Sequence, residues 1–430
     1  MSSSRRLGAL LALSVAVVFL APQAQAGSIE AIGQRYELSP ANLPAPYSSP
    51  TVGVTAESAA RPDGVMPKVP KGFQVSIFAS GIERPREMTV APDGTVFVSQ
   101  TYEGKVAALR DADGDGVAEM RTVFADGFRE PSGLAVQGDA LYVADRRAVW
   151  RIGFDGDRMR ALPREMITRP GALGQGGGHI TREIVFDKSG EHFFVSIGSE
   201  TNVGEDAWPR ATIQQFRSDG HAQTTFASGL RNPVGLVFHP DTDDLYTVVN
   251  ERSGLGAGLV PDYFTRVIRN GFYGYPYAYL GPHPDPQYGE LRPDLVQTSL
   301  TPDVLFAPQS GPLGLIFIKG KGFPPGFKGD AIVALHGAQT GNGYELVRVR
   351  FRDGRPLGGY ETFMTGFGAG LDRERADGTD DVWGRPVWLA EARDGALLVS
   401  DDVANVIWRV SWSGPTASNE SSAGTLPGVH

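Results

Sequence analysis

The chain has 430 residues, a formal net charge of -9, no cysteine, and 55 glycines and 31 prolines. The acidic balance and the lack of a Lys/Arg cluster argue against nucleic acid and anionic membranes as partners. Without cysteine there is no thiol nucleophile, zinc-thiolate site or Cys-x-x-Cys-His haem attachment. This much glycine and proline indicates many short strands joined by tight turns.

The first 26 residues have the composition of a secretory signal peptide. Arg5 and Arg6 form a basic start, residues 7–21 are almost wholly apolar, and Ala24-Gln25-Ala26 offers a small-residue cleavage site. The apolar run is too short for a membrane anchor, and no later run is long enough to span a bilayer. We therefore expect a periplasmic or secreted protein without a membrane span.

An extended arm follows, because residues 27–67 are rich in proline, alanine and serine. Residues 68–412 carry one recurring pattern: an apolar strand, a turn with Asp or Gly, an alternating strand, then small or acidic residues. The first turns lie about 50 residues apart, at Gly94, Gly138, Gly190 and Asp243. Residues 413–430 are expected to be a disordered tail.

Six copies of this pattern predict an all-β fold, a six-bladed β-propeller with the extended arm at its N-terminus. A segment from Gly254 to Gly311 is expected as an insertion in the fourth blade. Residues 74–79 form a spare strand that would complete the last blade and close the ring. The alternative fold is a pair of two-sheet sandwiches.

Two histidines are candidates for chemistry at the mouth of the central channel. His179 follows a glycine run and precedes a core strand, so its imidazole should be accessible, as a general base requires. A structural histidine that caps a turn is the competing interpretation. His336 ends a strand in another blade, at what should be the same face.

Arginines precede inner strands in two of the later blades. Arg231 and Asn232 offer a fork donor beside an amide, which suits a planar, oxygen-rich anion. An Arg-Asn pair that braces a turn is the alternative. Arg385, in Trp383-Gly384-Arg385-Pro386, adds another arginine in the last blade.

An acidic segment resembles the start of a calcium loop because its carboxylates alternate around a glycine turn. Its acidic residues are Asp111, Asp113, Asp115 and Glu119. The last of them comes at position nine rather than twelve, and no flanking helix is evident. A structural Ca²⁺ and an acidic hairpin turn are both open.

The chain resembles the sorbosone dehydrogenase family of exported sugar dehydrogenases that depend on pyrroloquinoline quinone (PQQ), and more distantly the soluble quinoprotein glucose dehydrogenase. The resemblance covers roughly residues 71–410 and rests on a set of motifs that follow one another along the chain in the same order as in the family. They are Pro85-Arg86, Gly177-Gly178-His179-Ile180-Thr181-Arg182, Gly198-Ser199-Glu200-Thr201-Asn202-Val203, Ala227-Ser228-Gly229-Leu230-Arg231-Asn232-Pro233, Asn250-Glu251-Arg252, Pro261-Asp262-Tyr263, Phe272-Tyr273-Gly274-Tyr275-Pro276, Gly384-Arg385-Pro386 and Ser400-Asp401-Asp402.

The resemblance implies a quinone cofactor over the channel mouth, beside Ca²⁺. His179 matches the family's general base, and Arg231 with Asn232 matches the pair that polarises the quinone carbonyls. Cofactor contacts are implied for Arg86, His336 and Arg385. The calcium neighbourhood, partly through backbone carbonyls, is implied for Glu251, Arg252, Ser253, Gly254 and Asp262. Hard oxygen ligands suit Ca²⁺, and arginines suit a tricarboxylate.

The leading hypothesis is therefore an exported PQQ-dependent dehydrogenase that oxidises an aldose or a sugar aldehyde, as a monomer or homodimer. Its electrons would pass to an external cytochrome or quinone, because the chain has no haem motif of its own. One alternative is a Ca²⁺-dependent six-bladed lactonase or hydrolase. The other is a non-catalytic propeller that binds sugar or protein, which the segment His336-Gly337-Ala338-Gln339 favours because the family often has Ser-Trp-Asn-Arg after this His-Gly pair.

Overall fold

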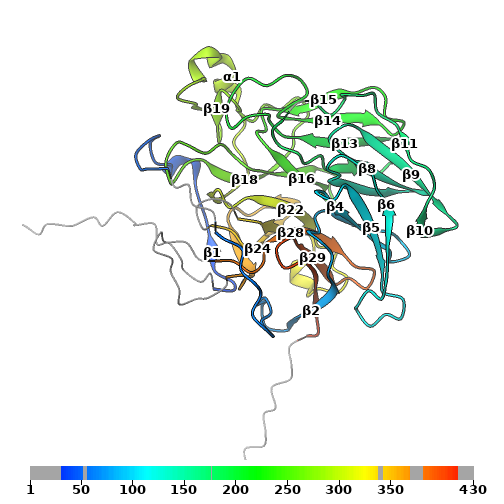
Figure 1. Ribbon diagram of the computed structural model, residues 1–430. Coiled ribbons are helices and arrows are strands. Elements are labelled where there is room, and N and C mark those ends of the chain that lie inside the picture. The colour runs from blue at the N-terminus through cyan, green and yellow to red at the C-terminus, as the bar shows by residue number, and fades with distance from the viewer. Residues whose placement is uncertain (1–30, 52–55, 176, 338–341, 369–380, 415–430) are drawn as a thin grey trace, which may run out of the picture.

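The computed structural model describes residues 31–51, 56–175, 177–337, 342–368 and 381–414. Six antiparallel sheets follow one another along the chain as blades (Figure 1), and this confirms the predicted six-bladed β-propeller. The first strands of successive blades touch around the whole ring, so they form its inner wall. The predicted signal peptide and residues 415–430 of the predicted tail lie outside the described residues.

The first three blades each take four consecutive strands, and the second of them carries one extra outer strand. Blade one contains β3 (Met88–Val90), β4 (Val96–Gln100), β5 (Lys105–Arg110) and β6 (Met120–Ala125). Blade two contains β7 (Gly133–Gln137), β8 (Ala140–Ala144), β9 (Val149–Asp155), β10 (Asp157–Ala161) and β11 (Glu165–Met166). Blade three contains β12 (Ile184–Phe186), β13 (His192–Ile197), β14 (Thr212–Arg217) and β15 (Thr224–Ser228).

Blade four is interrupted by an insertion, and blades five and six each receive a strand from the N-terminal segment of the chain. Blade four contains β16 (Pro233–Phe238), β17 (Leu245–Val249), β18 (Pro261–Arg266) and β21 (Val304–Pro308). Blade five contains β22 (Pro312–Phe317), β23 (Ala331–Leu335), β24 (Glu345–Val349), β27 (Tyr360–Met364) and β1 (Arg35–Tyr36). Blade six contains β28 (Pro386–Glu391), β29 (Leu397–Asp401), β30 (Val406–Trp412) and β2 (Phe73–Ser80). A small hairpin, β25 (Phe351–Arg352) and β26 (Arg355–Pro356), extends from blade five.

The core lies between the blades. The second strand β4 is buried along its whole length, as are β8, β17, β23 and β29, because both faces of each sheet pack against a neighbouring blade. Among the described residues, six buried apolar clusters lie between neighbouring blades. For example, Val98 of blade one packs with Leu398 of blade six. The near-continuous apolar strands in the sequence follow from this two-sided burial.

The ring closes in blade six, as the spare strand predicted. Strand β2 pairs antiparallel with β30, with Val75 opposite Val410 and Phe73 opposite Trp412. The N-terminal strand thus supplies the outer edge of the last blade, and this covers an edge that would otherwise be open. Ser413 continues the contact, since its backbone N–H donates to the carbonyl of Gly72 over 3.0 Å.

The described part of the N-terminal arm packs on the propeller. Strand β1 adds to the edge of blade five, with Tyr36 opposite Tyr360, and a short helix η1 (Pro40–Asn42) follows. Tyr47 then donates its backbone N–H to Leu255 over 2.7 Å, so the arm reaches the β17–β18 connection. No helix among the described residues could cross a membrane.

The insertion in blade four is shorter than predicted. Within the expected segment Gly254–Gly311, β18 and β21 are ordinary third and fourth strands of the blade, and the insertion is residues 267–303. It holds the hairpin β19 (Ala278–Tyr279) and β20 (His283–Pro284), then η2 (Gly289–Leu291) and α1 (Pro293–Thr298). The sequence concealed β18 because Gly254, Gly256 and Gly258 precede it and the strand itself begins with a proline, Pro261. Another short helix, η3 (Pro325–Phe327), lies in blade five.

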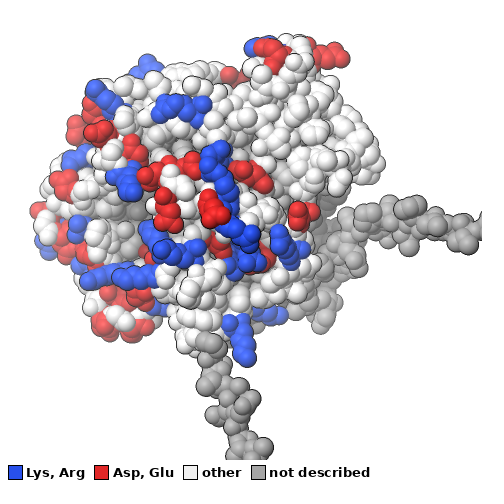
Figure 2. Space-filling view, turned by 180° about the vertical axis from the view of Figure 1, so that it is seen from behind, with Lys and Arg blue, Asp and Glu red and all other residues white. Residues whose placement is uncertain are grey.

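Charge on the surface is mixed in sign. Figure 2 shows Lys and Arg interspersed with Asp and Glu over one face of the molecule, with a largely uncharged region toward its upper right. No field of a single sign covers this face.

Candidate functional site

Strand polarity brings the predicted site residues to one end of the propeller. In each blade the start of the first strand lies beside the end of the second, as in the pairing of Pro233 with Val249 and of Pro386 with Asp401. Residues just before first strands and just after second strands therefore meet at the same mouth of the channel. Most of the predicted residues occupy these positions.

His179 lies in the connection before β12 and is held in one tautomer. Its Nδ1 is 2.9 Å from the carbonyl oxygen of Ser199. A carbonyl can only accept, so Nδ1 carries the proton and Nε2 keeps its lone pair. Burial, together with the charge of Arg231, lowers the pKa of His179 to about 4. The imidazole is therefore neutral at neutral pH.

Two buried arginines that the site predictions did not include hold the His179 loop. Arg182 donates from Nε to the carbonyl of Leu173 and from NH1 to that of His179, each over 2.9 Å. Arg210 donates from NH1 to the carbonyl of His179 over 3.2 Å. Burial lowers the pKa of Arg182 to about 9. These are positioning residues, and only Arg182 lies in a motif that the sequence singled out.

Arg231 lies beside the end of β17, with its guanidinium largely anchored to the protein. Its Nε and NH2 donate to the backbone and side-chain oxygens of Asn202, over 2.8 and 3.1 Å. Its NH1 donates to the carbonyl of Asn250 over 3.0 Å. These bonds use three of its five N–H groups. No described residue accepts from the other two, so Arg231 combines a fixed orientation with spare donors.

Asn232 and His179 meet around Gly198. The Asn232 side-chain oxygen is buried without a hydrogen-bond partner among the described residues. A Cβ built on Gly198 would lie 2.3 Å from that oxygen and 2.7 Å from the Cβ of His179. Only glycine allows this approach, which explains the glycine in the Gly198-Ser199 motif. An unpaired buried amide at a channel mouth points to a ligand.

The other three predicted cofactor residues gather around one carboxylate. Asp402 accepts from NH1 of Arg86 over 2.8 Å and lies 3.0 Å from Nε2 of His336. Arg385 donates to the carbonyls of His336 and Gly337. Burial alone would raise the pKa of Asp402. The interaction with His336, followed by the charges of Arg86 and Arg385, nevertheless holds this pKa well below its usual range.

The residues of the expected calcium neighbourhood divide into two roles. Asp262 accepts from the backbone N–H of Glu251 over 2.8 Å and of Gly311 over 2.9 Å, so it braces blades four and five. Glu251 accepts from the backbone N–H of Arg252 over 3.0 Å, while its other oxygen is buried without a partner among the described residues. Burial raises the pKa of Glu251 to about 7 and that of Asp262 to about 6.

The other three residues of the expected calcium neighbourhood, Arg252, Ser253 and Gly254, lie in the connection between β17 and β18. Arg252 donates from NH1 to Asp285 in the insertion. The carbonyl of Ser253 accepts from Nδ2 of Asn202 over 3.1 Å, and Gly254 follows with a positive φ of 96°. The Asn202 side chain thereby ties this turn to Arg231. Asn202 lies in one of the motifs of the sequence, but no role was predicted for it.

Two further carboxylates that the sequence did not single out line the inner wall. Glu87 and Glu183 are the residues before β3 and β12, in blades one and three, and both are buried. Burial raises the pKa of Glu87 to about 7 and raises that of Glu183 well above its usual value. The charge of Glu87 adds to the rise at Glu183. One oxygen of Glu183 has no partner among the described residues.

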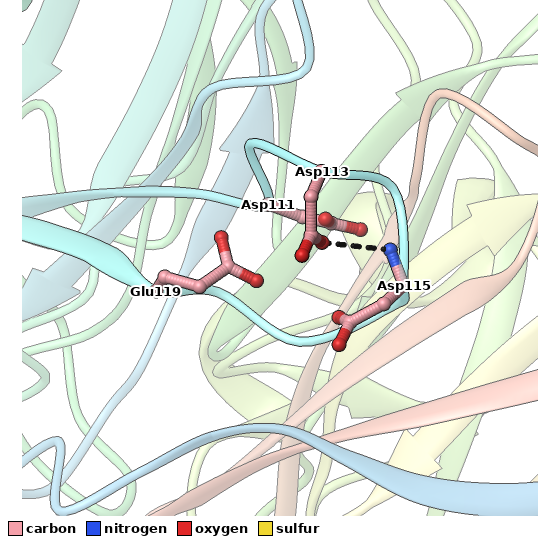
Figure 3. Close-up of side chains that lie close together, drawn as sticks. All are labelled: Asp111, Asp113, Asp115 and Glu119. Atoms are coloured by element: carbon pink, nitrogen blue, oxygen red, sulfur yellow. Dashed lines mark hydrogen bonds between the residues drawn. The ribbon is translucent and has the colours of Figure 1, made fainter.

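The acidic loop between β5 and β6 is a separate cluster on blade one. Figure 3 shows its four carboxylates turned toward one another, and their oxygens lie within 4.8 Å of each other. Asp111 accepts from the backbone N–H groups of Gly114 and Gly116, over 2.7 and 2.9 Å, and Glu119 accepts from that of Ala112 over 2.9 Å. The structure thus brings together Asp111, Asp113, Asp115 and Glu119, and Ca²⁺ binding there stays a prediction.

Comparisons with known proteins agree with this architecture. Residues 67–258 match the family model described as TrAA12-like. A protein of Borreliella burgdorferi described as uncharacterized is 26% identical over 360 residues, which cover 80% of this chain and 90% of that protein.

Two solved structures cover most of the chain. The PQQ domain of a pyranose dehydrogenase from Coprinopsis cinerea, in its holo form, has a TM-score of 0.67 at 19% identity and covers 83% of this chain and 100% of its own. A calcium structure of a Trichoderma reesei enzyme of carbohydrate-active family AA12 has a TM-score of 0.66 at 19% identity and covers 85% of this chain and 99% of its own. The chain shares the six-bladed fold of these proteins.

Proposed function

We propose that the chain is an exported, PQQ-dependent dehydrogenase that oxidises an aldose or a sugar aldehyde of the glucose or sorbosone type. The observation that carries the proposal is His179, a neutral imidazole whose Nε2 keeps its lone pair near Arg231 and Asn232. Removal of a hydroxyl proton requires such a base at the reacting carbon. The quinone, when bound, supplies the acceptor for the hydride.

The charges at the mouth fit a quinone with three carboxylates. Arg86, Arg231 and Arg385 lie around the channel, and the bond of Asp402 to Arg86 compensates one of these charges. The buried oxygen of Asn232 and the buried Nε2 of Gln309 lack partners among the described residues. The guanidinium N–H groups and the Gln309 N–H can donate to the oxygens of a planar anion. The Asn232 oxygen only accepts, so it requires an N–H or O–H donor, such as a sugar hydroxyl.

His179 becomes a better base when an anion is bound nearby. Part of its low pKa comes from the charge of Arg231. An anion beside Arg231 offsets that charge, so the pKa of His179 rises toward its usual value while Nδ1 remains bonded to Ser199. Arg182 and Arg210 hold the backbone carbonyl of His179, which keeps Nε2 directed at one position.

The unpaired oxygen of Glu251 supports a Ca²⁺ beside the cofactor. Carboxylate and backbone oxygens are the ligands that Ca²⁺ prefers, and Glu251 with the turn Arg252–Gly254 offers both kinds. Asp262 already accepts two backbone N–H groups and would act mainly by fixing Glu251.

The test is reconstitution of purified apo-protein with PQQ and Ca²⁺. Quinone binding should change its absorbance, and an artificial electron acceptor should then be reduced with some members of a panel of aldoses. His179→Ala should keep quinone binding and lose turnover. His221→Ala, which removes an exposed imidazole in blade three, is the matched control and should behave as the parent. Failure of the parent to bind the quinone would overturn the proposal.

A Ca²⁺-dependent hydrolase is the second candidate, because the inner wall holds Glu87, Glu183 and the unpaired oxygen of Asn232. Carboxylates and an amide facing a channel are what such a metal site requires. It predicts hydrolysis of lactones with Ca²⁺ alone and no response to the quinone. A non-catalytic propeller predicts sugar or protein binding without turnover. The residues 338–341 that favour this alternative lie outside the described residues.

Export and electron transfer complete the proposal. Residues 1–26 would be removed, so the N-terminus of protein recovered from the periplasm or medium should be Gly27. Electrons would leave to a cytochrome or quinone outside this chain, whether the chain is a monomer or a homodimer. An N-terminus at Met1 on the recovered protein would contradict the export step.

A further inference from the structure

A pocket of about 300 Å³ lies beside the His179 loop, between blades two and three, and three arginines line it. The arginines come from the two connections of blade two that reach the channel mouth, and the opposite wall comes from the segment ahead of His179. Its lining residues are Arg129, Arg146, Arg147, Met166, Pro170, Gly171, Gly174 and Gln175. This size suits one sugar residue.

A buried carboxylate fixes the backbone that carries these arginines. Asp145 accepts from the backbone N–H of Arg129 over 3.0 Å and from that of Arg147 over 2.7 Å. The backbone N–H of Arg146 donates to the carbonyl of Arg129 over 3.0 Å. Because Asp145 is fully buried, the three side chains stand on a rigid base while their guanidinium groups remain outside it.

The pocket has more positive charge than its carboxylates neutralise. Arg146 pairs with Glu130 over 2.7 Å. Arg129 and Arg147 make no side-chain hydrogen bond or ion pair with any described residue, and both are exposed. Behind the opposite wall, the Nε of Arg210 lies 3.0 Å from the position of a Cβ on Gly174, and it is buried without a partner among the described residues. An anion is the ligand that such a pocket would attract.

The pocket adjoins the proposed base. One guanidinium, that of Arg210, donates to the carbonyls of Gln175 over 2.8 Å and of His179 over 3.2 Å. These two oxygens are therefore at most about 8 Å apart, given the small span of a guanidinium and ordinary hydrogen-bond lengths. Gln175 lines the pocket, so the pocket adjoins the loop that carries His179.

We propose that this pocket binds the carboxylate of a uronate residue, and that the substrate is an acidic sugar chain whose uronate occupies the pocket while its neighbouring residue is oxidised at His179. The inference deepens the proposed function and rests on it for the oxidised residue. The arginines supply charge and fork geometry for a carboxylate, and Met166 with Pro170 supplies apolar surface for a sugar ring.

The binding test uses apo-protein and calorimetric titration, so it does not depend on quinone turnover. Glucuronate is the probe, glucuronamide is its neutral isostere, and inorganic phosphate tests for general anion binding. Arg129→Gln and Arg147→Gln should each weaken glucuronate binding about tenfold, as loss of one charged hydrogen bond implies. Arg393→Gln is the charge-matched control, because Arg393 is exposed in the β28–β29 turn at the opposite end of the propeller.

The parent and the Arg393→Gln control should bind glucuronate with the same affinity, and both pocket variants should bind it more weakly. All four proteins should bind glucuronamide poorly. In the loaded enzyme, KM for a uronate-containing disaccharide should rise in the pocket variants with kcat unchanged. Equal binding of phosphate and glucuronate, or equal affinity in all variants, would overturn the proposal. Glucuronate binding without any quinone binding would instead overturn the dehydrogenase proposal and leave the pocket assignment standing.

Discussion

The close approach of Gly198 to His179 and Asn232 predicts a large effect from a single methyl group. In Gly198→Ala the new Cβ would meet the Asn232 oxygen at 2.3 Å and the His179 Cβ at 2.7 Å, whereas carbon atoms in contact lie about 3.5–4 Å apart. One or both side chains must move by about 1 Å. Overpacking of this kind costs about 1–3 kcal/mol of stability, and a shift of 1 Å at a reacting group can lower the rate about 100-fold.

Two assays test this reasoning. Quinone-dependent dye reduction should show kcat/KM lowered about 100-fold, and denaturant unfolding should show the loss of stability. NMR titration of His179 gives a readout without turnover, because its pKa near 4 depends on burial and on the distance to Arg231. Gly326→Ala is the matched control, since a Cβ there meets nothing within 4 Å. A destabilised Gly198→Ala with parental kcat/KM and parental His179 titration would refute the argument.

Three further predictions concern stability. Burial raises the pKa of Glu87 to about 7, so the folded state keeps a proton that the unfolded state releases near pH 4.5. As the pH rises from about 4.5 to about 7, the unfolding free energy should therefore fall by up to about 3 kcal/mol. Glu87→Gln should flatten this fall. Ca²⁺ should raise the Tm of the parent by more than that of Asp111→Asn, which keeps only the Ca²⁺ site proposed at Glu251, and equal shifts would mean that the loop is only an acidic turn. Phe73→Ala should lower the unfolding free energy by about 3–5 kcal/mol, with the exposed neighbour Gln74→Ala as its control; equal losses would mean that the closing strand is held by its backbone alone.

The blades could be predicted because each one repeats a local pattern. A turn with glycine or aspartate between two apolar strands marks the inner half of a blade, and antiparallel pairing then decides which ends meet. His179, Arg231 and Arg385 therefore fall at one mouth without any knowledge of their contacts. The predicted bounds of the insertion in blade four were wrong because β18 follows three glycines and begins with Pro261, and glycine and proline also mark insertions.

Contacts that depend on side-chain direction could not be predicted. Arg210 precedes β14, a third strand, and nothing in its neighbours indicates that its guanidinium turns back under the His179 loop. Asp402 lies in a motif, but its place between Arg86 and His336 requires three blades to be assembled first. Strand β1 has two residues, too few for any periodicity to appear.

The seam that closes the ring also carries half of the candidate site. Strand β2 completes blade six. Asp402, which follows β29 of this blade, accepts a hydrogen bond from Arg86 of blade one and contacts His336 of blade five. Opening of the seam would separate these three groups, so an anion held between them would bind the closed ring and not the open one. Such a ligand stabilises the closed ring by linkage. Phe73→Ala, which loosens the seam, should therefore weaken ligand binding at the channel mouth. Phe73 itself packs with Phe323 and Phe363 in the core and lies away from the site residues.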